Sequence, residues 1–256
     1  MRVGLFIPCY VDAFHPEVGI ATLELLELLE LLELLERLGC EVDFPVDQTC
    51  CGQPMTNTGC HEESAATEAL FVRNFASFDY VVGPSGSCVH QVRFAFDAIE
   101  QTGEVRAVRA KTFELVEFLH DVLRVDAFPW AEFPHKVAPH NNCQTLRGLG
   151  IASYSERRAE PFSKPRDLLG RVEGLEFVDL ARPDECCGFG GTFSVFEEGV
   201  SAKMGYDKAH DQHRAGAEYV ASSDSSCMLH QQGCAERLGL PQKYIHIAQI
   251  LNGARA

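Results

Sequence analysis

Eight of the eleven cysteines in the chain fall into two sets that share one pattern. Each set begins with a single cysteine, continues well downstream with an adjacent Cys-Cys pair followed by glycine, and ends with another single cysteine. The two sets are Cys9, Cys50, Cys51 and Cys88, and then Cys143, Cys186, Cys187 and Cys227. Thiolates are soft ligands that favour iron–sulfur clusters, zinc or Cu(I). The pattern therefore predicts two soft-metal sites in a duplicated protein, with these eight cysteines as the candidate cofactor and metal ligands.

The spacing within each set bears on the kind of metal site. Structural zinc sites and ferredoxin-type clusters typically use Cys-x-x-Cys spacing, and this spacing does not occur in the chain. Because neighbouring side chains diverge, an adjacent Cys-Cys pair fits an extended or opened cluster more easily than one small ion or one cubane. The glycines that follow the pairs, Gly52 and Gly188, relieve crowding and allow backbone N–H groups to approach the sulfurs.

Short apolar runs next to turn residues predict the strands that position these cysteines. We expect strands at Val3–Ile7, Glu41–Pro45, Tyr80–Gly83, Lys136–Pro139, Leu175–Leu180, Ala217–Ser222 and Tyr244–Ile247. We expect helices in the first half at Glu17–Leu38, Glu62–Ala76, Val89–Thr102 and Thr112–Val125. The cysteine-bearing loops follow strands, and ligands collect beyond the carboxyl ends of parallel strands. Four sulfurs are therefore expected to converge at one edge of each sheet.

The two halves of the chain repeat one plan. Asp79–Cys88 and Glu218–Cys227 both run from an acidic residue through tyrosine, valine and a small polar loop to Ser-Cys, at the same offsets. Strands that alternate with helices imply α/β layering and mostly parallel sheets. We predict two pseudo-symmetric Rossmann-like α/β halves from an internal duplication, residues 1–128 and 135–256, with a linker bracketed by prolines at Pro129–Pro134.

A low-complexity tract of leucine and glutamate interrupts the first half at Leu23–Glu36. Its glutamates recur every three residues, and a period of three drifts by about 60° per step around an α-helix. The tract therefore predicts a poorly amphipathic helix and a poor coiled-coil seam. We interpret it as a tandem expansion of a shorter helix; the alternative is a leucine-rich surface for a partner.

Composition restricts the classes of partner. The 256 residues are 46% hydrophobic and 23% charged, and the formal net charge of −15 argues against a nucleic acid or an anionic membrane as partner. No apolar run approaches the roughly 18–20 residues that a membrane span needs. The apolar start of the chain is too short for a signal peptide, so we expect a cytoplasmic protein, in which cysteines bind metal more often than they form disulfides.

The paired Cys-Cys-Gly sets resemble the cysteine-rich (CCG) domain family, which includes the cysteine-rich subunit of heterodisulfide reductase and subunits of glycolate and glycerol-3-phosphate dehydrogenases. The resemblance is closest to the lactate-utilisation protein A family and covers nearly the whole chain. The residues that carry it are Val18–Thr22, Glu33–Pro45, Cys50–Pro54, Pro84–Cys88, Asn142–Cys143, Cys186–Val195 and His246–Ala248.

The resemblance implies a cytoplasmic iron–sulfur protein, a subunit of a multi-protein oxidoreductase that oxidises L-lactate to pyruvate. It implies one iron–sulfur cluster per half, of [4Fe–4S] type, with electron transfer as the role of the clusters. It also implies two partners, a ferredoxin-like iron–sulfur subunit and a third small subunit.

The chain departs from family members that have well-defined open clusters. Those members end each set in Cys-x-x-Cys, whereas here a histidine, His90 or His230, follows the last cysteine at different offsets. An open cluster, a cubane and zinc all remain open, as do two other functions: a zinc-binding scaffold of the same complex, and a thiol/disulfide redox enzyme like heterodisulfide reductase. His90 and His230 are candidate fifth ligands or proton carriers, and His140 and Arg147 lie near Cys143 in the sequence. Three further cysteines, Cys40, Cys60 and Cys234, are expected to be structural.

Overall fold

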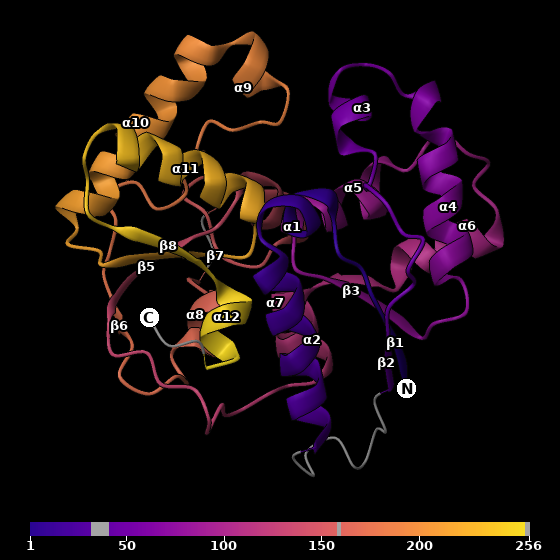
Figure 1. Cartoon of the computed structure of the whole chain (residues 1–256), viewed down its shortest axis with the longest axis horizontal. Coiled ribbons are helices and arrows are strands. Elements are labelled where there is room, and N and C mark those ends of the chain that lie inside the picture. Colours follow the sequence, from indigo (N-terminus) through magenta and orange to yellow (C-terminus); the bar gives the residue numbers. More distant parts are fainter. Residues whose placement is uncertain (32–40, 158–159, 254–256) are drawn as a thin grey trace. The chain divides into compact units, whose positions relative to one another are not determined.

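The computed structural model describes residues 1–31, 41–157 and 160–253. The chain divides into two compact units, Met1–Phe118 and Leu119–Ala256. Within the described residues, each unit contains one four-stranded sheet with helices packed on it (Figure 1). Cys40 and the C-terminal part of the Leu-Glu tract lie outside the described residues.

The first unit contains β1 (Arg2–Leu5), α1 (Cys9–Phe14), α2 (Pro16–Leu31), β2 (Glu41–Asp43), α3 (Gln53–Asn57), η1 (Glu62–Ser64), α4 (Ala65–Phe75), β3 (Tyr80–Gly83), α5 (Gly86–Ala95), α6 (Gly103–Ala110), β4 (Thr112–Glu114) and α7 (Leu115–Glu117). The π-helical turn η2 (Phe118–Val122) leads into the second unit. That unit contains β5 (Lys136–His140), η3 (Gln144–Leu149), α8 (Lys164–Leu169), β6 (Glu176–Phe177), α9 (Phe193–Phe196), α10 (Glu198–Arg214), β7 (Tyr219–Ser222), α11 (Ser225–Arg237), β8 (Lys243–His246) and α12 (Ile247–Leu251).

The two sheets have the same topology. The strand order is β2-β1-β3-β4 in the first unit and β6-β5-β7-β8 in the second, and the pairings between these strands are parallel. The register also repeats, since Val3 lies opposite Tyr80 in the first sheet and Val137 lies opposite Tyr219 in the second. The predicted fold class, two Rossmann-like α/β halves with parallel sheets, is confirmed. The segment Pro129–Pro134, predicted as a linker, packs in the second unit, where the indole N–H of Trp130 donates to the carbonyl of Leu251 at 2.9 Å.

One predicted helix is wrong at its start. Thr112–Glu114 forms β4, the fourth strand of the first sheet, and the helix begins only after it. Glu114 is the N-cap, because its carboxylate accepts hydrogen bonds from the backbone N–H groups of Val116 and Glu117 at 2.8 and 3.3 Å. Thr and Phe are compatible with a strand, and parallel pairing with β3 keeps these three residues out of the helix that follows. The short helix α6, capped by Thr102, was also not predicted.

An aromatic cluster fills the core of the first unit. Phe6, directly after β1, is fully buried and packs edge-on against Phe71 with ring centroids 5.0 Å apart. Phe71 in turn packs edge-on against Phe96 at 5.4 Å. In Figure 1, α2 and α4 lie on opposite sides of β1 and β2. The end of β1, from which the first cysteine follows, is therefore fixed by packing on all sides.

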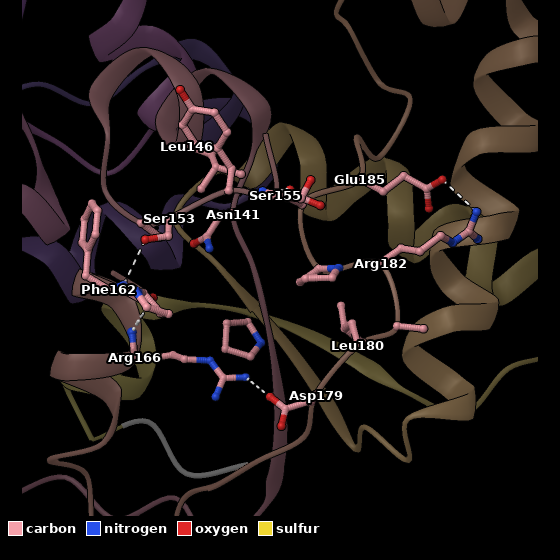
Figure 2. A pocket seen from close by; sticks show the side chains of 18 of the residues that line it. Asn141, Leu146, Ser153, Ser155, Phe162, Arg166, Asp179, Leu180, Arg182 and Glu185 are labelled. Atoms are coloured by element: carbon pink, nitrogen blue, oxygen red, sulfur yellow. Dashed lines mark hydrogen bonds and ion pairs between the residues drawn. The ribbon is translucent and has the colours of Figure 1, made fainter. Parts of the chain in front are cut away.

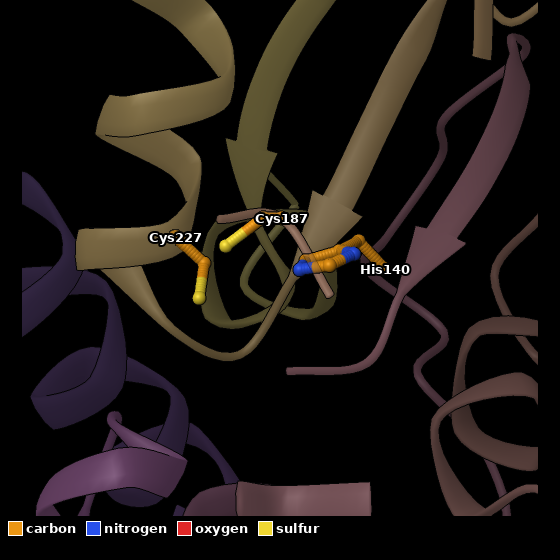
Figure 3. A group of neighbouring side chains, drawn as sticks. All are labelled: His140, Cys187 and Cys227. Carbon is orange, nitrogen blue, oxygen red and sulfur yellow. The ribbon is translucent and has the colours of Figure 1, made fainter. Parts of the chain in front are cut away.

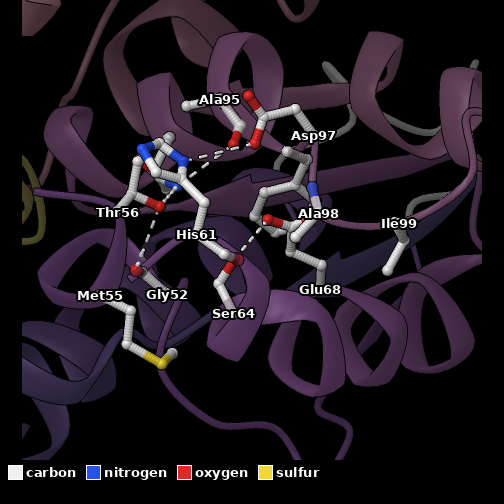
Figure 4. Close-up of polar contacts among 12 residues, drawn as sticks. Gly52, Met55, Thr56, His61, Ser64, Glu68, Ala95, Asp97, Ala98 and Ile99 are labelled. Carbon is white, nitrogen blue, oxygen red and sulfur yellow. Dashed lines mark hydrogen bonds and ion pairs between the residues drawn. The ribbon is translucent and has the colours of Figure 1, made fainter. Parts of the chain in front are cut away.

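Buried polar contacts fix the loops that follow the first Cys-Cys pair (Figure 4). The Glu68 carboxylate accepts hydrogen bonds from the Ser64 hydroxyl at 2.8 Å and from the Ala98 N–H at 3.1 Å. Burial raises the pKa of Glu68. The amide of Gln91 on α5 donates to the Thr56 hydroxyl on α3 at 2.8 Å. These contacts connect the segment after the pair to the helix that carries the last cysteine of the set.

Helix α2 is weakly amphipathic, as the Leu-Glu pattern indicates, yet its described part buries one stripe. Val18, Leu25, Leu26 and Leu29 are at most 2% exposed, whereas Glu24 and Glu27 are exposed. The three-residue repeat shifts its leucines around the helix axis. Over these three turns the shift is small enough that leucines at neighbouring positions still reach the core. None of the helices in residues 1–31, 41–157 and 160–253 has both the length and the hydropathy that a membrane span requires.

In the second unit, α10 and α11 lie on one side of the sheet and α8 and α12 on the other (Figure 1). Two buried charged residues of α10 hold the loop that leads to the second Cys-Cys pair. The ammonium group of Lys208 donates to the carbonyls of Arg182 and Pro183 at 2.8 and 3.2 Å. The Asp211 carboxylate accepts from the N–H groups of Ala181 and Arg182 at 3.3 and 3.0 Å. Burial lowers the pKa of Lys208, and Asp211 opposes this effect.

The buried stripe of α2 gives a first prediction. Leu25→Ala should lower the free energy of unfolding by about 2–5 kcal/mol, because it removes a fully buried side chain and leaves a cavity. Ile20→Ala is the matched control on the same helix, since Ile20 is 57% exposed; it should stay within about 0.5 kcal/mol of wild type. Urea denaturation measures the free energy of unfolding of both variants. Equal losses in Leu25→Ala and Ile20→Ala would show that the stripe does not pack in the core.

The Lys208 contacts give a second prediction. Lys208→Met keeps the volume but leaves two buried carbonyls without their donor, so we expect a loss of about 1–3 kcal/mol. Amide hydrogen exchange should also accelerate across residues 181–188. Lys203→Met on the exposed face of α10 is the control, because Lys203 pairs with Asp207 at the surface. Unchanged exchange in Lys208→Met would contradict the anchoring role.

Candidate metal centres

In the first unit, three segments that follow strands bring the four cysteines together. Cys9 begins α1 after β1, Cys50 and Cys51 lie in the loop after β2, and Cys88 lies in the first turn of α5 after β3. The sulfurs of Cys9 and Cys50 are 3.5 Å apart. Cys50 is also hydrogen-bonded to Cys51, and Cys51 to Cys88. The four thiols thus form one continuous run of contacts at the carboxyl edge of the sheet.

Gln48 fixes the loop that precedes the first Cys-Cys pair. Its amide oxygen accepts a hydrogen bond from the Ile7 N–H at 2.7 Å, and its amide nitrogen donates to the Leu5 carbonyl at 3.1 Å. This side chain therefore binds the loop after β2 directly to the end of β1. It thereby connects the segment that precedes Cys9 to the segment that precedes Cys50.

The thiols of the first set share their protons unequally. Hydrogen bonds from Cys51 and Cys9, with a further one from the Gly52 N–H, lower the pKa of Cys50 to about 3. The same contacts with Cys50, together with burial, raise the pKa values of Cys9 and Cys51. Of these three thiols, Cys50 is readily ionised while the other two keep their protons. A bound cation is what would allow contacting thiols to ionise together.

The second unit repeats this arrangement. Cys143 immediately precedes η3, Cys186 and Cys187 lie in the loop after β6, and Cys227 lies in the first turn of α11 after β7. Hydrogen bonds link Cys143 to Cys186, Cys186 to Cys187, and Cys187 to Cys227. Hydrogen bonds from Cys143 and Cys187 lower the pKa of Cys186 to about 2, whereas the contact with Cys186 and burial raise that of Cys187.

The glycine after each Cys-Cys pair brings a backbone N–H group to a sulfur, as the sequence predicts. Gly52 and Gly188 adopt positive φ angles of 84° and 92°, and the N–H of each donates to the sulfur two residues earlier at 3.4 Å. At Gly188 a Cβ would also lie 2.7 Å from the carbonyl oxygen of Ser201. Only glycine fits there, and both turns direct an N–H group at a sulfur.

More polar side chains lie around the second set of cysteines than around the first. His140, at the end of β5, is 1% exposed, and one of its ring nitrogens lies with the sulfurs of Cys187 and Cys227 in a group whose atoms are all within 4.8 Å of one another (Figure 3). Burial, with the positive charge of Lys208, lowers the pKa of His140 to about 3, so the imidazole is neutral. The buried Asp224 carboxylate accepts hydrogen bonds from the Cys227 N–H at 3.3 Å and from the Asn142 amide at 3.0 Å.

A cavity of about 860 Å³ lies beside the second set (Figure 2). Its lining includes Asn141 and Glu185, which are two and one residues before cysteines of the set. The two arginines in its lining are ion-paired, Arg166 with Asp179 at 2.6 Å and Arg182 with Glu185 at 2.9 Å. The cavity therefore adjoins the cysteine loops, with its arginine charges already compensated.

The remaining candidates from the sequence have other contacts. Arg147 pairs with Glu156 at 2.7 Å and donates to the Asp184 carbonyl, so it connects two loops at the surface. The ring of His90 packs on Phe94 with centroids 5.0 Å apart. His230 hydrogen-bonds the main chain of Ser201 at 3.3 Å and that of Cys187. Cys60 is exposed and Cys234 is buried.

His140 is the residue whose importance the sequence leaves hidden. Its place near Cys143 was apparent, but its full burial and its proximity to Cys187 and Cys227 depend on strand pairing across the second sheet. A comparison of the two halves could have indicated it. Three residues before the first cysteine of each set, the first half has Phe6 and the second half has His140.

Comparisons with known proteins agree with the duplicated pattern. The family described as "Cysteine-rich domain" matches residues 3–93 and 137–232. The chain is 42% identical to "Lactate utilization protein A" of Exiguobacterium sp. over 98% of this chain and 97% of that protein. It is 41% identical to "Lactate utilization protein A" of Geobacillus kaustophilus over 98% of this chain and 99% of that protein.

Among solved structures, a hypothetical protein from Helicobacter pylori matches with a TM-score of 0.50 and 10% identity, over 98% of this chain and 48% of that protein. The chain thus spans about half the length of that structure, and the likeness concerns the fold alone. The sequence relatives cover the whole duplicated pattern at about 40% identity. The chain therefore belongs to the lactate utilization protein A family of cysteine-rich domain proteins.

Proposed function

We propose that this chain is a cytoplasmic iron–sulfur subunit of an oxidoreductase system that oxidises L-lactate to pyruvate. The observation that carries the proposal is the continuous run of four thiols at the carboxyl edge of each sheet. The relatives named for lactate utilization support the substrate. All eight cysteines would serve as ligands, four for each cluster.

The donor sets fit iron–sulfur clusters. Each set offers four soft thiols, and in each the sulfurs contact one another in a row that includes two adjacent residues, which favours a ligand larger than a single ion. The N–H groups of Gly52 and Gly188 would hydrogen-bond sulfur in the bound state too, and such bonds stabilise the negative charge of a cluster. A cluster of [4Fe–4S] type in each unit would exchange one electron at a time, and oxidation of one lactate releases two electrons.

The residues of the chain divide each site into an inner and an outer side. Cys51, Cys88, Cys187 and Cys227 are buried, whereas Cys143 is exposed and Cys9 is partly exposed. The inner thiols would shield the group from water, and the outer ones would lie where a redox partner can approach. We propose a ferredoxin-like iron–sulfur subunit and a third small subunit as those partners.

A zinc-binding scaffold of the same complex is the second candidate. It is favoured by the group of His140, Cys187 and Cys227, whose ligand atoms lie close enough together for one ion. Zinc commonly binds a mixture of histidine and cysteine. In this case the zinc ion would stabilise the second unit, and other subunits of the complex would transfer the electrons.

Metal analysis separates the two functions. Anaerobically purified protein should contain iron and acid-labile sulfide, and Cys50→Ser and Cys187→Ser should each halve both, because each removes a ligand from one site. Cys60→Ser is the matched control and should leave both contents unchanged, since Cys60 is exposed and outside the sets. If the protein contains zinc and no acid-labile sulfide, the redox function is wrong and the zinc-binding scaffold is supported.

Growth tests the physiological role. A lactate-utilising bacterium that lacks the gene for this chain should fail to grow on L-lactate, and the wild-type gene should restore growth. The Cys187→Ser gene should restore less than a tenth of the growth rate, while Cys60→Ser restores all of it. Normal growth of the deletion strain on lactate would disprove the proposal, and growth on pyruvate controls for general defects.

A further inference from the structure

The duplication makes His140 and Phe6 equivalent positions. Val3 faces Tyr80 across the first sheet and Val137 faces Tyr219 across the second. Phe6 and His140 each lie three residues after that valine and three residues before the first cysteine of their set. Phe6 packs in the aromatic core of its unit. At this one position, therefore, the second unit has a metal-binding side chain where the first has an apolar one.

The surroundings of His140 leave its polar atoms unused. The side chain is 1% exposed, and among the described residues neither Nδ1 nor Nε2 has a hydrogen-bond partner. An unsatisfied buried polar group destabilises the folded state, and buried polar side chains are nearly always hydrogen-bonded. The phenylalanine of the first unit shows that this fold accepts an apolar ring at the same place. An imidazole buried in this way needs a partner that the described part of the chain does not provide.

The nearest suitable atoms are those of the cysteine set. One ring nitrogen and the sulfurs of Cys187 and Cys227 are all within 4.8 Å of one another, and Figure 3 shows a nitrogen of the ring on the side that faces the two sulfurs. A metal bound by both sulfurs is thus within reach of the imidazole after small side-chain movements. His230, the other histidine near the pair, already hydrogen-bonds the main chain.

We propose that His140 is a nitrogen ligand of the metal centre in the second unit. The donor set there consists of four cysteines and one histidine, whereas the first unit provides four cysteines alone. This inference rests on one part of the proposed function, namely that the second set of cysteines binds a metal. A neutral imidazole adds a nitrogen donor to the four sulfur donors without adding negative charge, and the reduction potential of an iron–sulfur centre depends on its ligands and their hydrogen bonds. The two centres are therefore unequal in their ligands.

Nitrogen ligation can be measured without activity. The Cys50→Ser variant isolates the second centre, and its histidines are labelled with ¹⁵N in anaerobically reconstituted full-length protein. Pulsed electron paramagnetic resonance of the reduced iron–sulfur centre should show a directly coordinated ¹⁵N nucleus. If zinc binds instead, X-ray absorption at the zinc edge should count one nitrogen ligand with the sulfurs.

Three substitutions in the Cys50→Ser background then identify the residue. His140→Phe should abolish the nitrogen signal and, if the centre contains iron, change its reduction potential. His230→Phe is the matched control and should change neither. His140→Cys should retain the metal while replacing nitrogen by sulfur, and thermal unfolding verifies that each variant is folded.

The outcomes separate the inference from the proposed function. Loss of the nitrogen signal in His140→Phe alone supports the assignment, whether the metal is iron or zinc, and zinc at that site would overturn only the redox function. A metal-loaded second centre without nitrogen coupling overturns the assignment, even if His140→Phe does not fold. A signal that persists in His140→Phe, or a second set that binds neither metal, also overturns it.

Discussion

The contact among four thiols at the end of a parallel sheet is the constraint on which each unit depends. Sulfurs this close cannot all ionise without a compensating cation, so the protons are shared and one cysteine of each set, Cys50 or Cys186, becomes strongly acidic. The proposed metal binding would let these thiols ionise together and would give their contacts a physical reason.

Holding the sulfurs in place requires rigid loops, and the structure uses buried polar anchors for this purpose. Gln48 binds the loop before the first pair to the end of β1, and Lys208 and Asp211 hold the loop before the second. Each anchor satisfies backbone groups that an irregular loop would otherwise bury without partners. The two units thus hold their cysteine loops with different anchors.

Divergence within the duplicated frame is the most informative feature of the second unit. The residues around its cysteines are polar, with Asn142 and Asp224 at the positions of Pro8 and Ser85 in the first unit and His140 at that of Phe6. Asp224 and Asn142 bind each other and the start of α11. One frame therefore presents two different chemical environments to the same four sulfurs, and these environments can set different electronic properties.

The sequence by itself determined the cysteine sets, the duplication and most of the strands, because these follow from residue type and spacing. It also indicated the role of Gly52 and Gly188, since glycine after an adjacent pair allows a turn that few other residues can adopt. Only the tertiary structure decided that Thr112–Glu114 joins the sheet, because a three-residue strand gains its stability from its neighbour, β3. Only it showed which leucines of α2 are buried, that one ring nitrogen of His140 faces the sulfurs, and that neither ring nitrogen has a hydrogen-bond partner among the described residues. Burial and proximity are properties of packing between segments distant in the chain, and a local pattern of residues does not contain them.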